Sequence, residues 1–376
     1  MSEVTMRREP LVRYLEAALG GSVEVEALRP LGIDEPVAAA REAVASRTGD
    51  LKAFGYGRPI QIDLLLNGMP RSYVLSTMRG GPGFGHDHFA DRAGELIWAH
   101  DTYGKLPSHV KSLDVGFITL EGEVRSAGRA EEYFLLMDKA EGVTYRVDLE
   151  RIRSEGTMTS LDLDRARALS SYLAKIHADK GQDVQLYFRR TRDLLGHGEG
   201  IMGILDGGYP ADYPLLSAKQ QYLVEAGCVA WRHHLKEKAK RLSIVHGDFH
   251  PWNILFREGT HFTLLDRSRG EWGEPADDVA ALSINYLFFS LLRSGRMEGP
   301  FVQLFELFYG DYLGQTQDLE LNQVIPPFFV FRALVIASPV WYPDLSEEVR
   351  LTLFRFVQAM LRVEQFDYKD LNHYLE

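Results

Sequence analysis

The segment from His246 to Asp278 constrains the folding of this chain more than any other part of its sequence. It begins His-Gly-Asp-Phe-His-Pro-Trp-Asn and continues to a short apolar run that ends in Asp266. Asp248 lies five residues before Asn253 and eighteen residues before Asp266. Because the glycine and the proline of the first segment interrupt any helix, we expect these polar side chains on a loop beside short apolar strands.

An Asp and an Asn at this spacing, with another Asp further along, supply the groups that phosphoryl transfer requires. One carboxylate accepts the proton of the attacking hydroxyl group. An amide oxygen and a second carboxylate hold Mg²⁺ against the phosphates, so that the protein contributes position and charge. The spacing therefore predicts Asp248 as the base and Asn253 and Asp266 as metal ligands.

The whole pattern, including Gly-x-Pro-x-x-Asp at 273–278, resembles the aminoglycoside phosphotransferase/choline kinase family. The resemblance implies an α+β, bilobal, protein-kinase-like fold with an antiparallel sheet plus a helix in the small lobe and a large, mainly helical lobe. It also implies ATP or GTP as the phosphoryl donor, Mg²⁺ as the metal, and a hydroxyl group of a small molecule as the acceptor.

The resemblance implies a role for each residue of the motif. Asp248 takes the place of the catalytic base. His246, a second catalytic candidate, opens the catalytic loop at a position that is usually architectural in the family. Asn253 and Asp266 take the places of the metal ligands, and Asp278 opens the next helix, where it braces the loop.

Two plainer interpretations compete with this one. His246 and His250 could bind zinc, but zinc sites of that type place both histidines on one helix face, and a catalytic zinc takes a third protein ligand. Asp266 could simply end a strand, because Asp is a common turn residue. Its spacing from Asp248 and Asn253 favours the metal site.

The order of predicted elements supports two lobes. Residues 1–137 are expected to form the small lobe, with a helical extension at 1–48 followed by a sheet. Residues 138–142 form the hinge, and 143–376 form the helical lobe with the catalytic loop at 246–253. Within the small lobe, strands are predicted at 51–54, 60–66, 73–78, 115–120 and 133–137, a hairpin turn at Asn67-Gly68, and helices near 11–19, 38–45 and 88–100.

Several residues of the small lobe and hinge are candidates for binding the nucleotide. Gly55 and Gly57 lie between two predicted strands, where a kinase-like fold lays a loop over the phosphates, although a hairpin needing positive φ would also use glycine. Met137 directly precedes the predicted hinge and Lys139 lies within it, and the main chain of this segment could contact adenine. The remaining candidates are Ser76, Arg79 and Glu95.

The sequence departs from the family at one of these positions. The third strand usually carries a lysine that pairs with a glutamate of the next helix, but Ser76 occupies that place and Glu95 lacks its partner. A serine brings no charge to neutralise phosphate. We expect Arg79, Arg92 or Lys52 to supply a cation. If none does, the protein could be a catalytically silent nucleotide-binding scaffold.

Two arginines follow the predicted metal ligand. Arg267 and Arg269 could reach a phosphate or an acidic substrate, or pair with Glu271 and Glu274, and ion pairs between near neighbours are the simpler expectation.

A second glycine-rich stretch does not predict a dinucleotide site. Residues 198–203 match G-x-G-x-x-G, but they follow a charged helical stretch and lead into a predicted turn, whereas a dinucleotide site needs a strand before and a helix after. We expect this loop on the acceptor side, near 196–232 and 268–275. The carboxylates there, such as Glu199, are mostly expected to be solvated.

The composition of the chain limits the classes of molecule that it is expected to bind and the compartment in which it is expected to function. The net charge of −11 argues against general affinity for nucleic acid or anionic membranes. The single Cys228 suggests a reducing compartment, and no signal peptide is visible, so a cytoplasmic protein is expected. The most apolar stretch, 324–342, is interrupted by three prolines and Arg332 and predicts a buried helix with turns.

Overall fold

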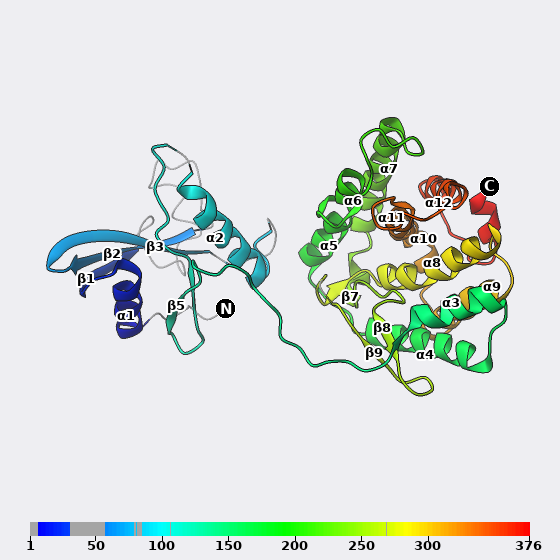
Figure 1. Ribbon diagram of the computed structural model, residues 1–376, viewed down its shortest axis with the longest axis horizontal. Coiled ribbons are helices and arrows are strands. Elements are labelled where there is room, and N and C mark those ends of the chain that lie inside the picture. Colours follow the sequence, from blue (N-terminus) through cyan, green and yellow to red (C-terminus); the bar gives the residue numbers. More distant parts are fainter. Residues whose placement is uncertain (1–6, 31–56, 79, 81–84, 106, 268) are drawn as a thin grey trace. The chain divides into compact units, whose positions relative to one another are not determined.

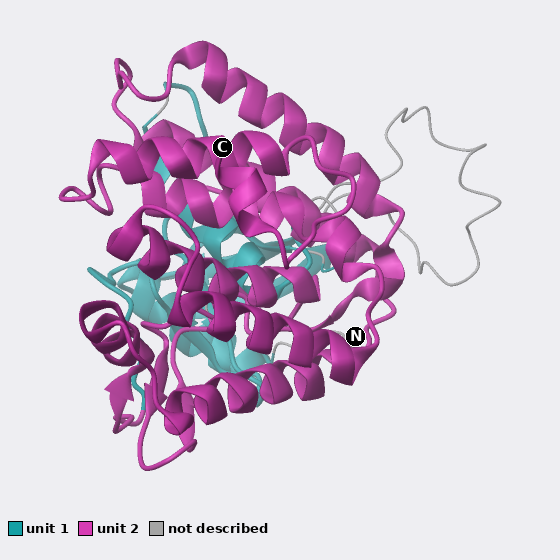
Figure 2. Ribbon diagram, turned by 90° about the vertical axis from the view of Figure 1, so that its right-hand side faces the viewer, with its two compact units in different colours: residues 1–137 teal, residues 138–376 magenta. Residues whose placement is uncertain are grey.

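The computed structural model describes residues 7–30, 57–78, 80, 85–105, 107–267 and 269–376. The chain divides into two compact units, residues 1–137 and 138–376 (Figure 2). The longest strands lie in the first unit and most of the helices in the second, so the predicted α+β class is confirmed. No helix among the described residues is long and apolar enough to cross a membrane.

Unit 1 contains a three-stranded antiparallel sheet. Its strands β1 (Val23–Pro30), β2 (Gly57–Leu66) and β3 (Met69–Met78) pair in the order β1-β2-β3 (Figure 1). Asn67 and Gly68 have φ angles of 51° and 78°, as a two-residue hairpin turn requires. Helix α1 (Arg8–Leu19) buries Leu11 and Leu15 against this sheet. Helix α2 (Phe89–Tyr103) and the short pair β4 (Gly116–Ile118) and β5 (Val124–Ser126) complete the unit.

Two predictions for this unit were wrong. The expected helical extension at 1–48 contains strand β1, whose alternating Val23-Glu24-Val25-Glu26 turns both valines into the small core. The apolar run 133–137 is not a strand, and its side chains are exposed, so apolar composition alone gave a false signal there. The strand expected at 51–54 and the helix at 38–45 lie outside the described residues.

Unit 2 is built mainly from helices around one large core. Its elements before the catalytic loop are β6 (Val143–Thr144), α3 (Tyr145–Glu155), α4 (Ser160–His177), α5 (Val184–Gly196), α6 (Ile201–Gly208), α7 (Ala218–Lys236), the 3₁₀ helix η2 (Ala239–Arg241) and β7 (Ser243–Ile244). Those after it are β8 (Ile254–Phe256), β9 (Phe262–Leu264), β10 (Trp272–Gly273), α8 (Pro275–Ser294), α9 (Pro300–Thr316), α10 (Leu321–Val324), α11 (Pro326–Ala337), α12 (Glu347–Met360) and η3 (Leu371–Leu375).

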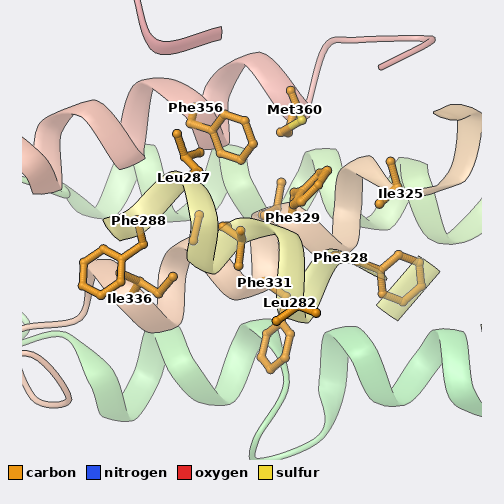
Figure 3. Close-up of a cluster of buried hydrophobic side chains, with 14 of the residues drawn as sticks. Leu282, Leu287, Phe288, Ile325, Phe328, Phe329, Phe331, Ile336, Phe356 and Met360 are labelled. Carbon is orange, nitrogen blue, oxygen red and sulfur yellow. The ribbon is translucent and has the colours of Figure 1, made fainter. Parts of the chain in front are cut away.

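The centre of this core lies where α8, α11 and α12 meet. Figure 3 shows apolar side chains of the three helices converging, among them Leu287, Phe329 and Phe356, each at most 1% exposed. The predicted buried helix in the apolar stretch 324–342 is therefore confirmed as α11. Burial of this size fixes α8 and α11 firmly against each other, and both helices carry side chains of the site described below.

Two short strand pairs bring the loops of unit 2 together. β8 pairs antiparallel with β9, with Ile254 opposite Leu264, and β7 pairs antiparallel with β10, with Ser243 opposite Gly273. As a result, residues 265–267 and 269–271 lie alongside the loop at 245–253.

Candidate active site

The predicted catalytic loop runs from β7 to β8 and turns sharply at Gly247. This glycine has φ of +88°, a conformation that residues with a Cβ atom rarely adopt. A Cβ atom there would also lie 3.1 Å from Cβ of Arg269. The glycine thus lets the loop reverse and lets a neighbouring segment pack against its backbone.

Asp278 holds this turn from the first helical turn of α8. Its two carboxylate oxygens accept hydrogen bonds of 2.7 Å from the main-chain N–H groups of His246 and Gly247. Nε2 of His177 lies 3.1 Å from the same carboxylate. Burial by itself raises the pKa of Asp278, but these hydrogen bonds and the nearby histidines outweigh it and lower the pKa. The carboxylate therefore braces the loop, as the resemblance implied.

His246 is 4% exposed and acts within the loop. Its Nδ1 accepts a 3.2 Å hydrogen bond from the main-chain N–H of Asp248, and its ring packs edge-on against Phe249. These contacts organise the turn, and a direct catalytic role for His246 stays a prediction.

Asp248 lies at the centre of a cluster of polar groups. Its Oδ1 accepts a hydrogen bond from Nη1 of Arg332. Its Oδ2 lies 3.4 Å from Nε2 of His250 and 3.4 Å from Nδ2 of Asn253. Burial raises the pKa of Asp248, but the His250 hydrogen bond and the charges of Arg332, His250 and Arg269 together hold it well below its usual range. The carboxylate is therefore ionised at neutral pH.

Arg332, on α11, was not identified from the sequence as a site residue. It is 7% exposed, and its Nη2 donates to the main-chain oxygen of Gly247 (3.1 Å) and to Oδ1 of Asp277 (2.7 Å). Its Nε is buried and has no hydrogen-bond partner among the described residues. Burial raises the pKa of Asp277, while the charge of Arg332 opposes that rise. The only signal in the sequence is a charged residue within a strongly apolar helix.

Asn253 is brought against Asp248 as the spacing predicted. Its Nδ2 donates to the main-chain oxygen of Asp248 at 3.1 Å and lies 3.2 Å from Nε2 of His250. The side chain is 9% exposed. Its Oδ1 makes no hydrogen bond to a described residue, so the amide presents the atom that could bind a metal.

Asp266 follows strand β9 and comes one residue after Leu265, whose backbone bonds to Asn253. The main-chain N–H of Leu265 donates to the main-chain oxygen of Asn253 at 2.9 Å. Asp266 has φ of 52°, which is unusual for a residue with a side chain and common at functional sites. Its exposed carboxylate has no hydrogen bond or ion pair with a described residue. Asp266 thus lies one residue beyond the backbone partner of Asn253 and has no hydrogen bond or ion pair with Asp248.

The donors suit Mg²⁺ shared with a nucleotide. No group of three or more His, Cys, Asp or Glu side chains within the described ranges could hold a metal alone. Mg²⁺ usually binds one or two protein carboxylates together with phosphates and water. One free amide oxygen and one exposed carboxylate, Asn253 and Asp266, match that requirement. They do not match the alternative of a zinc site formed by His246 and His250. His250 lies close to Asp248 and Asn253.

The nucleotide candidates of unit 1 and the hinge have few contacts. Ser76 is exposed on β3 opposite Pro59, Glu95 is exposed on α2, and Met137 and Lys139 are exposed in irregular chain. Gly57 begins β2 opposite Met78. Gly55, Arg79 and Lys52 lie outside the described residues. The roles of all of these residues stay predictions.

Two predicted cations have main-chain partners. Nη1 of Arg92 donates to main-chain oxygens at the start of α2, including that of His88 at 3.0 Å. Arg267 donates to the main-chain oxygens of Val245 and Glu271, at 2.8 and 3.2 Å through Nη2, so the expected side-chain ion pair for Arg267 was wrong. Both guanidinium groups serve the local backbone.

Glu274 pairs elsewhere than expected. It is 3% exposed and forms a 2.7 Å ion pair with Arg241. It also accepts a 2.7 Å hydrogen bond from the hydroxyl of Tyr187. The expectation of a mostly solvated acidic surface holds for the exposed Glu199, Asp206, Asp212 and Glu271, and fails for Glu274.

The stretch 198–203 differs from its prediction in one respect. Helix α5 precedes it, as expected, but helix α6 follows and extends to Gly208, into the segment 206–210 where a turn was predicted. No strand leads into it, so it still lacks the context of a dinucleotide site.

Comparison with known proteins supports the motif. Residues 116–301, which include the catalytic loop and hairpin, match the family described as phosphotransferase enzyme family. No curated protein matches the chain by sequence. The resemblance read from the motif is thereby confirmed.

Several solved structures resemble this one at low sequence identity. An ethanolamine kinase from Plasmodium vivax is 13% identical, with a TM-score of 0.35 over 84% of this chain and 77% of that one. The amicoumacin kinase hAmiN, solved with AMP-PNP and Ca²⁺, is 15% identical, with a TM-score of 0.39 over 86% and 91%. A thermostable mutant of the aminoglycoside phosphotransferase APH(4)-Ia is 17% identical, with a TM-score of 0.33 over 93% and 98%.

Proposed function

We propose that this chain, whose residues 116–301 match the phosphotransferase enzyme family, transfers the γ-phosphoryl group of ATP to a hydroxyl group of a small molecule. GTP is the alternative donor. The acceptor hydroxyl oxygen bonds to the γ-phosphorus while the bond from that phosphorus to the bridging oxygen breaks, and ADP leaves. The proton of the hydroxyl group passes to Asp248.

The observation that carries the proposal is the environment of Asp248. This half-buried carboxylate keeps its charge because Arg332 and His250 stabilise the ionised form, and Asn253 lies 3.4 Å from its Oδ2. A base held in one orientation accepts a proton from a positioned hydroxyl group efficiently. Since Oδ1 is occupied by Arg332, Oδ2 is the oxygen that we assign to the acceptor proton.

Asn253 and Asp266 are the residues that would hold Mg²⁺ in this site. When bound, the metal neutralises charge on the β- and γ-phosphates. Asn253 contributes its free amide oxygen, and Asp266 contributes its exposed carboxylate from the left-handed backbone position after β9.

The proposal also requires a cation in unit 1 that binds the phosphates of the nucleotide in place of the lysine that is absent at Ser76. Ser76 carries no charge, and Arg92 donates to the backbone of α2. We propose that Arg79 or Lys52 supplies the cation. Alanine substitutions at these two positions should weaken ATP binding, and unchanged affinity in both would contradict this part alone.

A screen for phosphoryl transfer tests the function. The full chain is incubated with Mg·ATP or Mg·GTP and a panel of small alcohols, amino alcohols, sugars and hydroxy acids, and phosphorylated product is detected by mass spectrometry. We expect Mg²⁺-dependent phosphorylation of at least one acceptor class. Stabilisation by Mg·ATP without product from any acceptor would support the alternative of a silent nucleotide-binding scaffold.

A further inference from the structure

Arg269 is a cation that lies beside the catalytic loop. Its Cβ packs against Gly247, and its guanidinium carbon lies 4.9 Å from the centre of the Phe331 ring. The side chain is half-buried, yet it makes no hydrogen bond or ion pair with any described residue. Partly burying a guanidinium group without a partner is unfavourable, so this position is poised for an anion from outside the protein.

Of the two arginines next to the Phe331 ring, Arg332 is balanced by carboxylates, whereas Arg269 has no ion pair with a described residue. Arg332 lies 5.0 Å from the centre of the same Phe331 ring, but its charge is balanced by Asp248 and Asp277. Burial and the charge of Arg332 lower the pKa of Arg269, and the carboxylates of Asp277 and Asp248 oppose that change. Glu199 also acts on Arg269 through space, without an ion pair. Burial and the positive charge of Arg332 both disfavour the charged form of Arg269. An additional anion would offset this unfavourable effect.

The two oxygens of Asp248 separate the surroundings into two sides. Oδ2 faces His250 and the metal-ligand candidate Asn253. Oδ1 faces Arg332, whose guanidinium shares the Phe331 ring with Arg269. The acceptor hydroxyl must reach Oδ2 of Asp248, so the rest of the acceptor lies close to the groups around this carboxylate. Arg269, which interacts with the charge of Asp248 and lies away from the metal-ligand candidates, is available to bind a second group of the acceptor.

We propose that the acceptor carries an anionic group, a carboxylate or a phosphate ester, and that Arg269 binds this group while the acceptor hydroxyl approaches Asp248. The proposal rests on the phosphotransferase function given above. A planar guanidinium group suits bidentate recognition of either anion. The charge of Arg269, which has no ion pair with a described residue, disfavours a cationic acceptor because like charges repel.

Four probes of similar size test the acceptor class: glycerate, glycerol 3-phosphate, glycerol and ethanolamine. Binding to the full chain is measured by calorimetry with Mg·AMP-PNP present, and transfer is measured with Mg·ATP. We expect glycerate or glycerol 3-phosphate to bind more tightly than the neutral and cationic probes. The better of the two identifies the anion as a carboxylate or a phosphate ester.

Arg269 variants show whether that preference comes from this residue. Loss of a charge-assisted hydrogen bond should weaken binding of the preferred anion about tenfold to a hundredfold in Arg269→Gln. Arg269→Lys, which keeps the charge, should retain part of the affinity. The matched control is Lys236→Ala on α7, because Lys236 likewise lies over an aromatic ring, 4.9 Å from the centre of Phe188. Melting temperatures confirm that each variant is folded.

The outcomes separate this inference from the proposed function. Transfer to glycerol or ethanolamine without preference for an anion would overturn the acceptor assignment and leave the phosphotransferase intact. Anion binding that depends on Arg269, without transfer to any acceptor, would contradict the phosphotransferase and leave the anion site. The assignment would also be overturned if no anion binding were detected. The same holds if Arg269→Gln weakened the binding of Mg·AMP-PNP and left the discrimination between acceptors unchanged.

Discussion

Arg332 and Asp248 form an ion pair although 84 residues separate them in the sequence. The same guanidinium group donates to the main-chain oxygen of Gly247 at 3.1 Å and to Asp277 at 2.7 Å. One side chain from the core helix α11 thus fixes both the backbone and the carboxylate of the catalytic loop. We infer that Arg332 is a positioning residue for Asp248.

The Arg332→Lys substitution tests this role. A single ammonium group keeps the charge but cannot donate in the same planar arrangement to three acceptors, so Asp248 should lose its fixed orientation. We expect kcat to fall about tenfold to a hundredfold, with a much smaller change in KM for Mg·ATP, as steady-state kinetics would measure. Arg355→Lys on α12 is the matched control. A kcat equal to that of the wild type would rule out positioning by Arg332.

Asp278 makes stability depend on pH. Its folded-state pKa is lowered, against the effect of burial, by His177 and by the hydrogen bond from the His246 backbone. The ionised carboxylate therefore stabilises the fold above its unfolded pKa of about 4, and this stabilisation is lost as pH falls through the lower folded pKa. The carboxylate of Asp278 accepts several hydrogen bonds. Replacing it in Asp278→Asn should therefore lower the free energy of unfolding by about 2–4 kcal/mol at neutral pH.

Urea unfolding across this pH range measures the effect. The wild type should lose free energy of unfolding as the solution is acidified, and Asp278→Asn should lose less over the same range. Exposed Asp164 on α4 provides the control substitution, Asp164→Asn. Parallel pH profiles for the wild type and Asp278→Asn would show that this carboxylate does not contribute as described.

Asp266 and Asn253 predict the metal dependence of the reaction. Removing one ligand should weaken Mg²⁺ binding about tenfold to a hundredfold, so Asp266→Asn and Asn253→Ala should need correspondingly more Mg²⁺ for half-maximal transfer. Chelation with EDTA should abolish wild-type transfer, and added Mg²⁺ should restore it. Asp206→Asn, at an exposed position of α6, should keep the wild-type Mg²⁺ requirement. An unchanged requirement in Asp266→Asn would exclude Asp266 as a ligand.

The contact between Asp248 and Asn253 was predictable because it is local. Five residues separate them, and the glycine and proline between His246 and Asn253 force the loop to fold back on itself. The pairing of β8 with β9 follows from two short apolar runs close in sequence, and it sets Asp266 at the end of β9, while the role of Asp266 as a metal ligand stays a prediction. The amphipathic and buried helices of unit 2 were visible from their apolar spacing.

Features that depend on distant packing were not predictable. Arg332 reaches Asp248 only because the apolar side chains of α8 and α11 pack together (Figure 3). Glu274 has a basic partner 33 residues away, in Arg241, whereas Arg267, only seven residues away, binds main-chain oxygens instead. The segment 133–137 shows the opposite error, because an apolar run has no structure of its own without a sheet to join.

Substitution of Asp248 by Asn tests the central claim most directly. The amide keeps the size of the side chain but cannot accept the acceptor proton. The comparison is the rate of transfer from Mg·ATP to the best acceptor in the screen, for wild type and Asp248→Asn, with melting temperature and Mg·AMP-PNP affinity measured in parallel. We predict a fall in kcat of about a hundredfold or more with nucleotide binding retained. A variant that transfers phosphate at the wild-type rate would contradict the assignment of Asp248 as the base.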